Sequence, residues 1–262
     1  MNILDSIIAK KRLEVEERKR NTSVFQLESE DFFKCAVLDF KEYLLRDDKT
    51  GIIAEFKRKS PSKGIINDIS TVAGVTNGYT KNGASAISIL TDEEFFGGSL
   101  KDLKEAKFNK VPILRKEFII DKYQLIESKA FGADVILLIA ACLTKYEVKD
   151  LASSAKSLGL NVLLEIHNEQ ELEHICDDVD VVGVNNRDLQ TFTVDLNRSI
   201  ELGKLIPSDK IKISESGIEN VATIKLLRQY NFKGFLMGEK FMKEKDPGEA
   251  FRIFTEELRN VL

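Results

Sequence analysis

Cysteine and histidine are scarce in this chain, which has three cysteines and two histidines among 262 residues. Cys35, Cys142 and Cys176 are isolated, and none belongs to a Cys-x-x-Cys pair. Scattered thiols in odd number are typical of a reduced compartment and argue against a disulfide framework. No carboxylate or thiolate cluster with metal-site spacing surrounds His167 and His174. The sequence therefore predicts neither a disulfide-stapled fold nor a metal site.

Long apolar runs are also absent, and no window approaches the roughly 18 apolar residues that a membrane span needs. The N-terminus becomes charged at Lys10 and does not resemble a signal peptide. The 39 Lys plus Arg against 43 Asp plus Glu give a net charge of −4, which is no reason to expect nucleic-acid binding. The usual dinucleotide and mononucleotide fingerprints are missing as well. We therefore expect a cytoplasmic protein without a cofactor that binds neither membrane nor nucleic acid.

Short β-rich runs and helical segments alternate from Gly51 onward, at intervals of roughly 20 to 35 residues, the length of one strand, one helix and two loops. Several helical segments end at Gly83, Gly132 or Gly159, as a left-handed C-cap before a new strand requires. Eight such units predict an α/β fold of the (β/α)8 TIM-barrel type more strongly than an open doubly wound sheet. The predicted strands are Ile52–Lys57, Ala86–Leu90, Pro112–Lys116, Asp134–Ile139, Asn161–Ile166, Val181–Asn185, Lys210–Glu215 and Gly234–Met237. The helical segments include Asp102–Lys107, Tyr123–Phe131, Lys145–Leu158, Glu169–Cys176, Ile200–Leu205 and Asn220–Tyr230.

A helical prefix of about 45 residues precedes the first strand. Residues 2–20 have helical periodicity, and a second helical stretch is predicted at Phe25–Leu45. The apolar face of this prefix must pack on the body of the protein. No linker or low-complexity tract divides the chain. We therefore expect a single barrel domain over residues 1–262, in which the helical extension 1–45 packs on the barrel and caps the mouth of the site.

Charged residues stand at the ends of the predicted strands, where a barrel of this type carries its active site. Glu55 and Lys57 are two residues apart and so point to the same side of a strand. Opposite charges on an inward face are costly unless they are paired or used. Strands three, five and seven end in Lys116, Glu165 and Glu215, and odd-numbered strands contribute to common inward layers. Any one of these charges could simply begin a solvated loop, but the collective pattern indicates a site.

Glycines after strands seven and eight indicate a phosphate site. Barrels of this type commonly bind phosphate with these loops, which here hold Ser216-Gly217 and Gly238-Glu239, each expected at the start of a helix. Glycine lets backbone N–H groups approach an anion closely. Either glycine alone could equally be a turn residue, and Glu239 is awkward beside a phosphate unless its side chain points away.

With these residues in place, the chain resembles the indole-3-glycerol phosphate synthase family of the tryptophan pathway. The resemblance covers nearly the whole chain, including the helical prefix, and its motifs follow in order at successive strand ends. Glu117 departs from the family, which more often has Asp there, and the position of Phe56 is variable. The chain is too short for the fused isomerase domain of some relatives. The matching segments are IIAEFKRKSPSKG, LTDEEFFGGS, ILRKEF, LLEIHN, GVNNRDL, SESGI and FLMGE.

The resemblance implies a reaction. The family's substrate is 1-(2-carboxyphenylamino)-1-deoxyribulose 5-phosphate, and ring closure with loss of CO₂ and water gives indole-3-glycerol phosphate. By resemblance, Lys116 is the general acid for ring closure and Glu165 the general base for dehydration. Lys57 pairs with the substrate carboxylate and can also supply a proton. The resemblance assigns substrate positioning to Glu55, Asn185, Glu215 and Arg187, and phosphate binding to Ser60, Ser216, Gly217, Gly238 and Glu239, the last through its backbone.

The chemistry of that reaction agrees with the residues. It needs no redox agent, and both reacting atoms are in one small, anionic, phosphorylated molecule that the site has to fold. The aromatic ring needs an apolar wall, for which Phe95, Phe118 and Leu138 are candidates, although Leu138 also fits a core position. The neighbours Arg115 and Lys116 cannot both point into the barrel, and sequence alone does not say which does. Nor does it give the direction of the Lys116 pKa shift. For the oligomeric state we expect a monomer or a weak homo-oligomer that can associate with other enzymes of tryptophan biosynthesis.

Other functions stay open at this point. A Schiff-base aldolase would use Lys57 or Lys116 as a nucleophile on a sugar phosphate. An isomerase barrel of the same pathway would not explain the Glu55 and Lys57 pair together with the prefix. A non-catalytic barrel would bind a phosphorylated metabolite without turnover.

Overall fold

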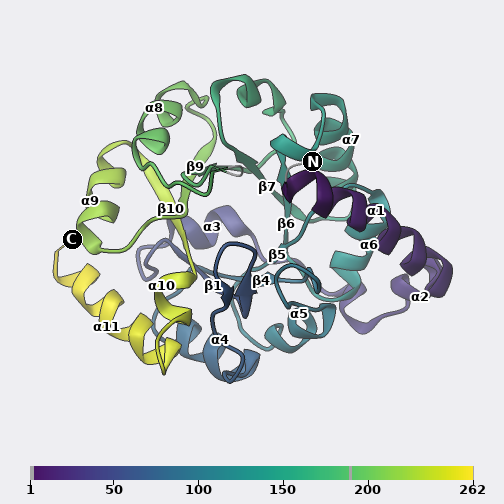
Figure 1. Ribbon diagram of the computed structural model, residues 1–262, viewed down its shortest axis with the longest axis horizontal. Coiled ribbons are helices and arrows are strands. Elements are labelled where there is room, and N and C mark those ends of the chain that lie inside the picture. Colours follow the sequence, from purple (N-terminus) through teal and green to yellow (C-terminus); the bar gives the residue numbers. More distant parts are fainter. Residues whose placement is uncertain (1–2, 189–190, 262) are drawn as a thin grey trace.

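Eight parallel strands close into a barrel in a computed structural model that describes residues 3–188 and 191–261 (Figure 1). The order around the barrel is β1-β10-β9-β8-β7-β6-β5-β4, so each strand pairs with its neighbour in the chain and the last pairs with the first. The predicted (β/α)8 barrel is confirmed, and each predicted strand lies within two residues of an observed one. The barrel strands are β1 Ile52–Phe56, β4 Ala86–Leu90, β5 Ile113–Lys116, β6 Val135–Ile139, β7 Asn161–Ile166, β8 Val181–Asn185, β9 Ile211–Glu215 and β10 Phe232–Met237.

Helices surround the barrel, and polar side chains cap many of their first turns. Thr144, for example, accepts from the backbone N–H of Glu147, whose side chain returns to Thr144 in a capping box. The predicted left-handed ends are confirmed at Gly83, Gly132 and Gly159, with φ of 94°, 90° and 79°. The outer helices are α4 Val72–Lys81, α5 Leu100–Ala106, α6 Lys122–Ala130, α7 Lys145–Ser157, α8 Asn197–Leu205, α9 Val221–Gln229, α10 Glu239–Met242 and α11 Pro247–Asn260.

Two predicted helices are wrong in form. The segment predicted at Glu169–Cys176 is a 3-10 helix, η3, over Glu169–His174. The stretch Phe25–Leu45 is broken into α2 Val24–Glu28, a 3-10 turn η1 over Asp31–Lys34 and α3 Phe40–Leu45. The physical reason is local, because Asp39 turns its side chain onto the N–H of Glu42 and starts a new helix there. Two shorter elements, the 3-10 turn η2 Ala140–Cys142 and the β2–β3 ladder of Lys59–Ser60 with Gly64–Ile65, lie in loops after β6 and β1.

The prefix is divided between the two ends of the barrel. Helix α1, Ile3–Asn21, begins at the edge of the face that carries the strand C-termini and runs outward over α6, whereas α3 lies behind the strands in the same view (Figure 1). Phe40 and Leu44 of α3 pack into the barrel interior from its N-terminal end. Asn161, the first residue of β7, donates to the carbonyl of Leu38 at 2.9 Å and fixes that approach. The expectation that the whole prefix caps the mouth is therefore wrong for its second half.

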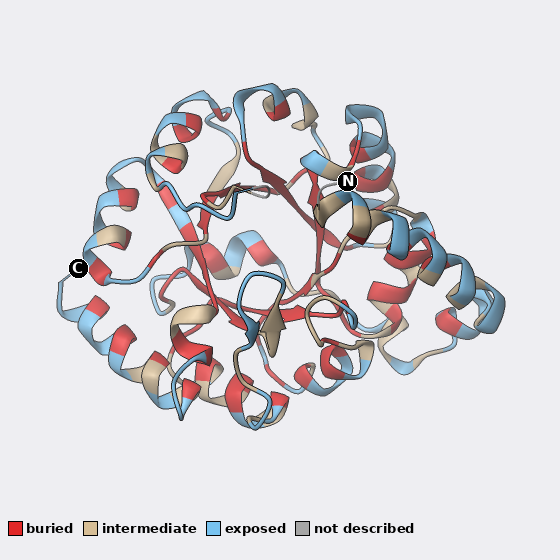
Figure 2. Ribbon diagram, viewed as in Figure 1, coloured by how far each residue is buried: buried red, intermediate tan, exposed pale blue. Residues whose placement is uncertain are grey.

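The barrel strands are buried along most of their length (Figure 2), and they separate two apolar clusters, one inside the barrel and one between the strands and the helices. Residues such as Ile52 and Ala54 point outward and pack against the surrounding helices. Ile53, between them, points into the barrel. Because side chains alternate along each strand, the inward-pointing residues at the C-terminal strand ends lie at the mouth of the barrel.

Candidate active site

Charged side chains from β1, β5, β7 and β9 meet inside the mouth of the barrel. The Lys57 ammonium lies 2.9 Å from Glu55 Oε1, as side chains two residues apart allow. Lys116 Nζ donates to Glu165 Oε2 at 2.6 Å and to Glu215 Oε2 at 3.0 Å. Only 17% of the Lys116 side chain is exposed. The structure thus brings together the charges that close alternate strands in the sequence.

Lys116 and its neighbour Arg115 point to opposite sides of β5, because side chains alternate along a strand. Arg115 faces away from the barrel interior and is fully buried against α6. There it donates to the carbonyl of Gln124 at 3.0 Å and pairs with Glu127 at 2.8 Å. The question that the sequence left open is settled in favour of Lys116 as the inward residue.

The two carboxylates that share Lys116 have pKa values shifted in opposite directions. Burial lowers the pKa of Lys116, but Glu165, Glu215 and Glu55 outweigh burial and raise it above the ordinary value. Burial and the neighbouring carboxylates raise the pKa of Glu215 to about 7, against the opposing effect of Lys116. For Glu165, Lys116 and His167 overcome burial and hold the pKa well below its usual range. Glu165 is therefore the carboxylate that stays ionised, and Glu215 is the one that takes up a proton more readily.

Two further side chains contact the Glu165 carboxylate. Asn185, at the end of β8, donates to Glu165 Oε1 at 3.0 Å. His167 Nε2 lies 3.2 Å from the same oxygen. Sequence reasoning considered His167 only as a metal ligand and missed this contact, although its place two residues after Glu165 was a usable signal. A Cβ at Gly183 of β8 would lie 2.2 Å from Glu215 Oε1, so any larger residue there would displace the Glu215 carboxylate.

A cavity of about 170 Å³ opens beside these charges. Its walls include the charged residues Glu55, Lys57, Lys116, Glu165 and Glu215. The apolar wall is Phe96, Phe118, Leu137 and Ile139, and α1 adds Ile3, Leu4 and Ile7 from the side of the mouth. The first helix of the prefix therefore contributes directly to the cavity, as an apolar cover over a charged floor.

Two predicted members of the apolar wall need correction. Leu138 is fully buried in the outer layer between strands and helices, because its neighbours Leu137 and Ile139 take the inward positions. Phe95 is outside the cavity lining, and the adjacent Phe96 occupies the wall instead. Phe118 lines the cavity as predicted. Adjacent apolar residues are interchangeable in a sequence pattern, and only strand and loop geometry separates them.

The predicted phosphate residues gather at one end of the mouth. Ser60 lines the main cavity, and an adjoining pocket is lined by Gly217 and Gly238, while Ser216 and Glu239 line both. Ser216 and Gly217 both have positive φ, 67° and 76°. The expected helix does not start there, since α9 begins four residues later at Val221. Gly238 does precede a helix, the short α10.

The Glu239 side chain does not point away from the site. Its Oε1 lies 2.5 Å from Lys63 Nζ, and its Oε2 lies 3.6 Å from Arg187. Despite burial, Lys63 and then Lys57 and Arg187 lower the pKa of Glu239. In this arrangement the carboxylate occupies cations that an anionic ligand would otherwise attract. Gly238 is needed beside it, because a Cβ there would be 2.8 Å from the Cβ of Glu55.

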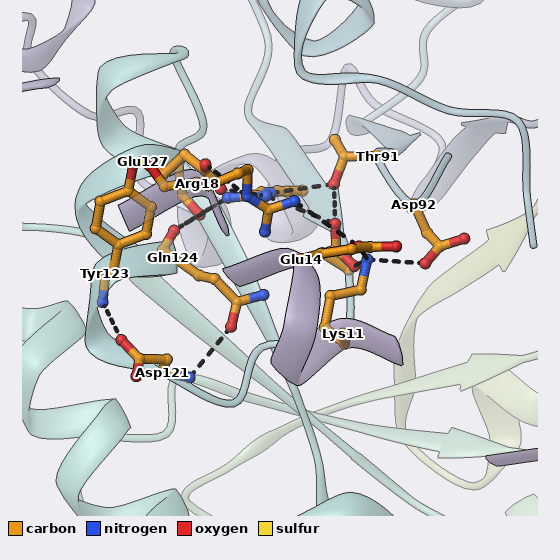
Figure 3. A network of polar contacts seen from close by, with 12 residues as sticks. Lys11, Glu14, Arg18, Thr91, Asp92, Asp121, Tyr123, Gln124 and Glu127 are labelled. Atoms are coloured by element: carbon orange, nitrogen blue, oxygen red, sulfur yellow. Dashed lines mark hydrogen bonds and ion pairs between the residues drawn. The ribbon is translucent and has the colours of Figure 1, made fainter. Parts of the chain in front are cut away.

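A second buried charge network, seen in Figure 3, ties α1 to the barrel. Lys11 has 1% of its side chain exposed and pairs with Asp92 at 2.8 Å and with Glu117 at 3.0 Å. Glu117 also accepts from Thr91 at 2.8 Å. Arg18, about two turns further along the same face of α1, pairs with Glu127 at 3.0 Å. The network includes Glu117, the residue that follows Lys116, so it holds α1 against the strand end that carries the central lysine.

Among residues 3–188 and 191–261, no group of three or more His, Cys, Asp or Glu side chains is arranged to hold a metal ion. Within the same ranges, no helix has the length and apolar character of a bilayer span.

Solved structures place the chain in a class. It matches KGPDC from Streptococcus mutans with a TM-score of 0.59 at 16% identity, covering 80% of this chain and 97% of that one. It matches 3-hexulose-6-phosphate synthase from Salmonella typhimurium with a TM-score of 0.60 at 13% identity, covering 80% and 98%. At such low identity these likenesses show the fold alone. Together, the fold and the charged cavity define a (β/α)8-barrel enzyme with its site at the strand C-termini.

The sequence comparisons are more specific. The profile of the family described as indole-3-glycerol phosphate synthase matches residues 4–254. The protein of that name from Bacteroides thetaiotaomicron is 47% identical over 259 residues, covering 98% of this chain and 99% of that protein. Its namesake from Alkaliphilus metalliredigens is 42% identical over 262 residues, covering 99% of each chain. The chain belongs to the indole-3-glycerol phosphate synthase family, a family of carboxy-lyases in tryptophan biosynthesis.

Proposed function

We propose that this chain converts 1-(2-carboxyphenylamino)-1-deoxyribulose 5-phosphate to indole-3-glycerol phosphate, with Lys116 as general acid and Glu165 as general base. The observation that carries the proposal is the contact of Lys116 with Glu165, at 2.6 Å, in the floor of a cavity with an apolar wall. The reaction is inferred from the family, and the contact places an acid and a base close enough for a proton to pass directly between them.

The proton balance of the reaction requires both partners. Ring closure adds a proton to the carbonyl oxygen, and dehydration adds a second one as that oxygen leaves as water. Dehydration also removes one proton from the carbon next to nitrogen, so each turnover consumes one proton in all. Lys116 gives the first proton, Lys57 gives the second and Glu165 accepts the one removed. The short contact from Glu165 to Lys116 then lets the accepted proton return to the lysine.

The cavity has a separate region for each part of the substrate: its aromatic ring, its carboxylate and its phosphate. The aromatic ring would lie against Phe96 and Phe118, with its carboxylate toward Lys57. Glu55 holds Lys57 in place, while Asn185 and Glu215 orient the acid–base pair. The phosphate would lie over Ser60, Ser216, Gly217 and Gly238, where Arg187 and the backbone N–H of Glu239 add positive potential.

An aldolase mechanism through Lys116 receives less support from the geometry. A Schiff base needs an unprotonated amine, whereas the two carboxylates in contact with Lys116 raise the pKa of its ammonium. The structure suits this lysine to giving a proton to a substrate oxygen. Lys57, the other candidate nucleophile, is already paired with Glu55.

Product fluorescence provides the test. Wild type should form indole-3-glycerol phosphate from the synthetic substrate, and Lys116→Met and Glu165→Gln should not approach its rate. Absence of product from wild type contradicts the proposed activity, and undiminished rates in both variants contradict the residue roles. Borohydride added with substrate should trap no covalent adduct, and an adduct on Lys57 or Lys116 would favour the aldolase.

The proposal includes a monomer or weak homo-oligomer that works in the cytoplasm and can associate with other enzymes of tryptophan biosynthesis. It also treats residues 1–262 as one domain. Size-exclusion chromatography with light scattering tests the first point, and a single cooperative melting transition tests the second.

A further inference from the structure

Lys116 lies between Glu165 and Glu215, and the proposed reaction needs these two carboxylates to differ. Lys116 Nζ contacts Glu165 Oε2 at 2.6 Å and Glu215 Oε2 at 3.0 Å, so the lysine alone distinguishes them only weakly. Two buried carboxylates this close to one cation compete for one proton. If that proton resides on Glu165, the general base is lost. Something else in the site must decide which carboxylate is ionised.

Two groups distinguish Glu165 from Glu215: the neutral amide of Asn185, which donates to Glu165 Oε1 at 3.0 Å, and the titratable ring of His167. The His167 Nε2 atom lies 3.2 Å from Glu165 Oε1, whereas Lys116 contacts Oε2. In the part of the chain that the structure describes, Nε2 has no hydrogen-bond partner, so this contact acts through charge and not through hydrogen-bond geometry. Glu215 has no equivalent: within the described ranges its Oε1 atom is buried without a hydrogen-bond partner. The geometry points to His167, held by Glu171, as the positioning residue that keeps Glu165 and not Glu215 in the form that accepts a proton. This inference rests on the proposed function.

Glu171 fixes the imidazole from the other side. His167 Nδ1 lies 3.3 Å from Glu171 Oε2, and the backbone N–H of His167 donates to the same oxygen at 2.7 Å. Asn168 anchors the second oxygen of Glu171 at 2.6 Å. The ring is 8% exposed and lies between two carboxylates, so a charged imidazolium is the form that both neighbours stabilise. Glu165 and Glu171 together overcome burial and raise the pKa of His167 to about 9.

The other groups near this ring do not change its charge. Cys142 of η2 faces Glu165 and Glu171, and burial and these two carboxylates raise the pKa of its thiol to about 12, so it stays neutral. Lys116 approaches Glu165 from the barrel side. Arg198 of α8 extends toward the carbonyl of Asn185, at 3.4 Å. His167 is therefore the cation beside Glu165 Oε1, and Glu171 is its counter-ion.

The first experiment is the pH dependence of kcat, because a merely structural residue would not move it. In His167→Gln the amide keeps a neutral donor near Glu165 but carries no charge. Below about pH 7, where the pair holds a proton, that proton would then be shared between Glu165 and Glu215. Each unit by which the pKa of Glu165 rises lowers its ionised fraction about tenfold under acid conditions. We expect kcat to fall about tenfold at pH 6 and to recover toward wild type above pH 8, with KM little changed.

Two variants sharpen the result. Glu171→Gln should move the acid limb of kcat in the same direction by a smaller amount, because it removes only the counter-ion of His167. His174→Gln is the matched control, since the His174 ring contacts the carbonyl oxygens of Leu143 and Glu171 and not Glu165. Its profile should match wild type. Equal loss of kcat at every pH in His167→Gln would overturn the inference, as would an unmoved acid limb.

A second experiment does not depend on turnover. The chain has two histidines, so His174→Gln leaves a single imidazole signal for NMR titration. In that background His167 should titrate well above pH 6.5, and Glu165→Gln or Glu171→Gln should lower its midpoint. An ordinary midpoint that neither variant moves would sink the inference even for an active enzyme. If wild type forms no product but the midpoint responds to Glu165→Gln, the proposed function has failed while the coupling of His167 to Glu165 stands.

Discussion

Two buried glutamates, Glu117 and Glu215, each contact a lysine near the mouth of the barrel, yet their pKa values shift in opposite directions. Glu117 pairs with Lys11 and also has Arg115 nearby, and these two cations overcome burial and lower its pKa. Glu215 has Lys116 alone, which also serves Glu165, so burial prevails and its pKa rises to about 7. The difference is the ratio of cations to carboxylates, because both glutamates are buried to the same degree.

The same contrast separates the regions around them. The part of the network in Figure 3 around Lys11 is closed to solvent, since the side chains of Lys11 and Asp92 are each 1% exposed, and it joins α1 to the barrel. The central cluster opens to a cavity, and 17% of Lys116 remains exposed. Charges that are closed to solvent do not meet a bound molecule, and the role that remains for them is to hold α1 against the barrel. A cluster that borders a cavity and holds more carboxylates than cations can exchange protons with a bound molecule, as acid–base chemistry requires.

The largest expected effect comes from removing the acid or the base of the central cluster. Lys116→Met and Glu165→Gln should each lower kcat by about 10² to 10⁴-fold, the usual range for loss of general acid–base catalysis. Both variants should remain folded at the assay temperature, so that the loss of kcat is not a loss of folded protein. Steady-state kinetics beside melting curves checks the pair. A variant that melts early and keeps its kcat would reverse the comparison of the two regions.

Lys11→Met should show the opposite balance. It strands Asp92 and Glu117 in the interior, and breaking a buried ion pair by removing one partner typically costs about 3–5 kcal/mol of unfolding free energy. Urea denaturation measures this loss. The kcat of the folded fraction should stay within about tenfold of wild type, because Lys11 does not line the cavity. A larger loss of kcat without loss of stability would give the network around Lys11 a catalytic role.

The pH dependence of stability separates the two glutamates. Glu215 binds a proton more tightly in the folded protein than in the unfolded chain, so its contribution to stability is present below about pH 4.5 and is lost as pH rises toward about 7. Glu117 acts in the opposite sense, since its pKa is lowered on folding and its contribution is lost as pH falls through that lowered value. Glu215→Gln should therefore flatten the decline in unfolding free energy between pH 4.5 and 7. An unchanged slope would contradict the raised pKa.

The smallest effect is expected for an exposed ion pair. Lys122 lies 2.7 Å from Asp150, with 55% and 63% of the side chains exposed. Lys122→Gln should change the free energy of unfolding by less than about 1 kcal/mol. Measured in the same urea series, it is the matched control for Lys11→Met. A loss as large as that of Lys11→Met would show that burial does not explain the difference.

The barrel was predictable because its signals are local and repeated. Alternating strands and helices, and glycines such as Gly83 and Gly132, follow from side-chain size, periodicity and the positive φ that glycine tolerates. The family motifs likewise named Glu55, Lys57, Lys116, Glu165 and Glu215, which the structure gathers at one end. The break of Phe25–Leu45 was harder to foresee, because Asp39 caps a helix only once its backbone leaves the helical path.

Contacts between residues that are distant in the chain could not be predicted from the sequence. Nothing local to Lys11 indicates that it pairs with Asp92 and Glu117. The spacing of His167 and Glu165 places them on one side of the strand, but only the structure shows that the His167 ring reaches the Glu165 carboxylate. The sequence by itself determined which residues stand at which strand ends, since periodicity and turn chemistry act over a few residues. Only the tertiary structure decided which charges are compensated, because burial and the count of neighbouring cations arise when separate strands and α1 meet.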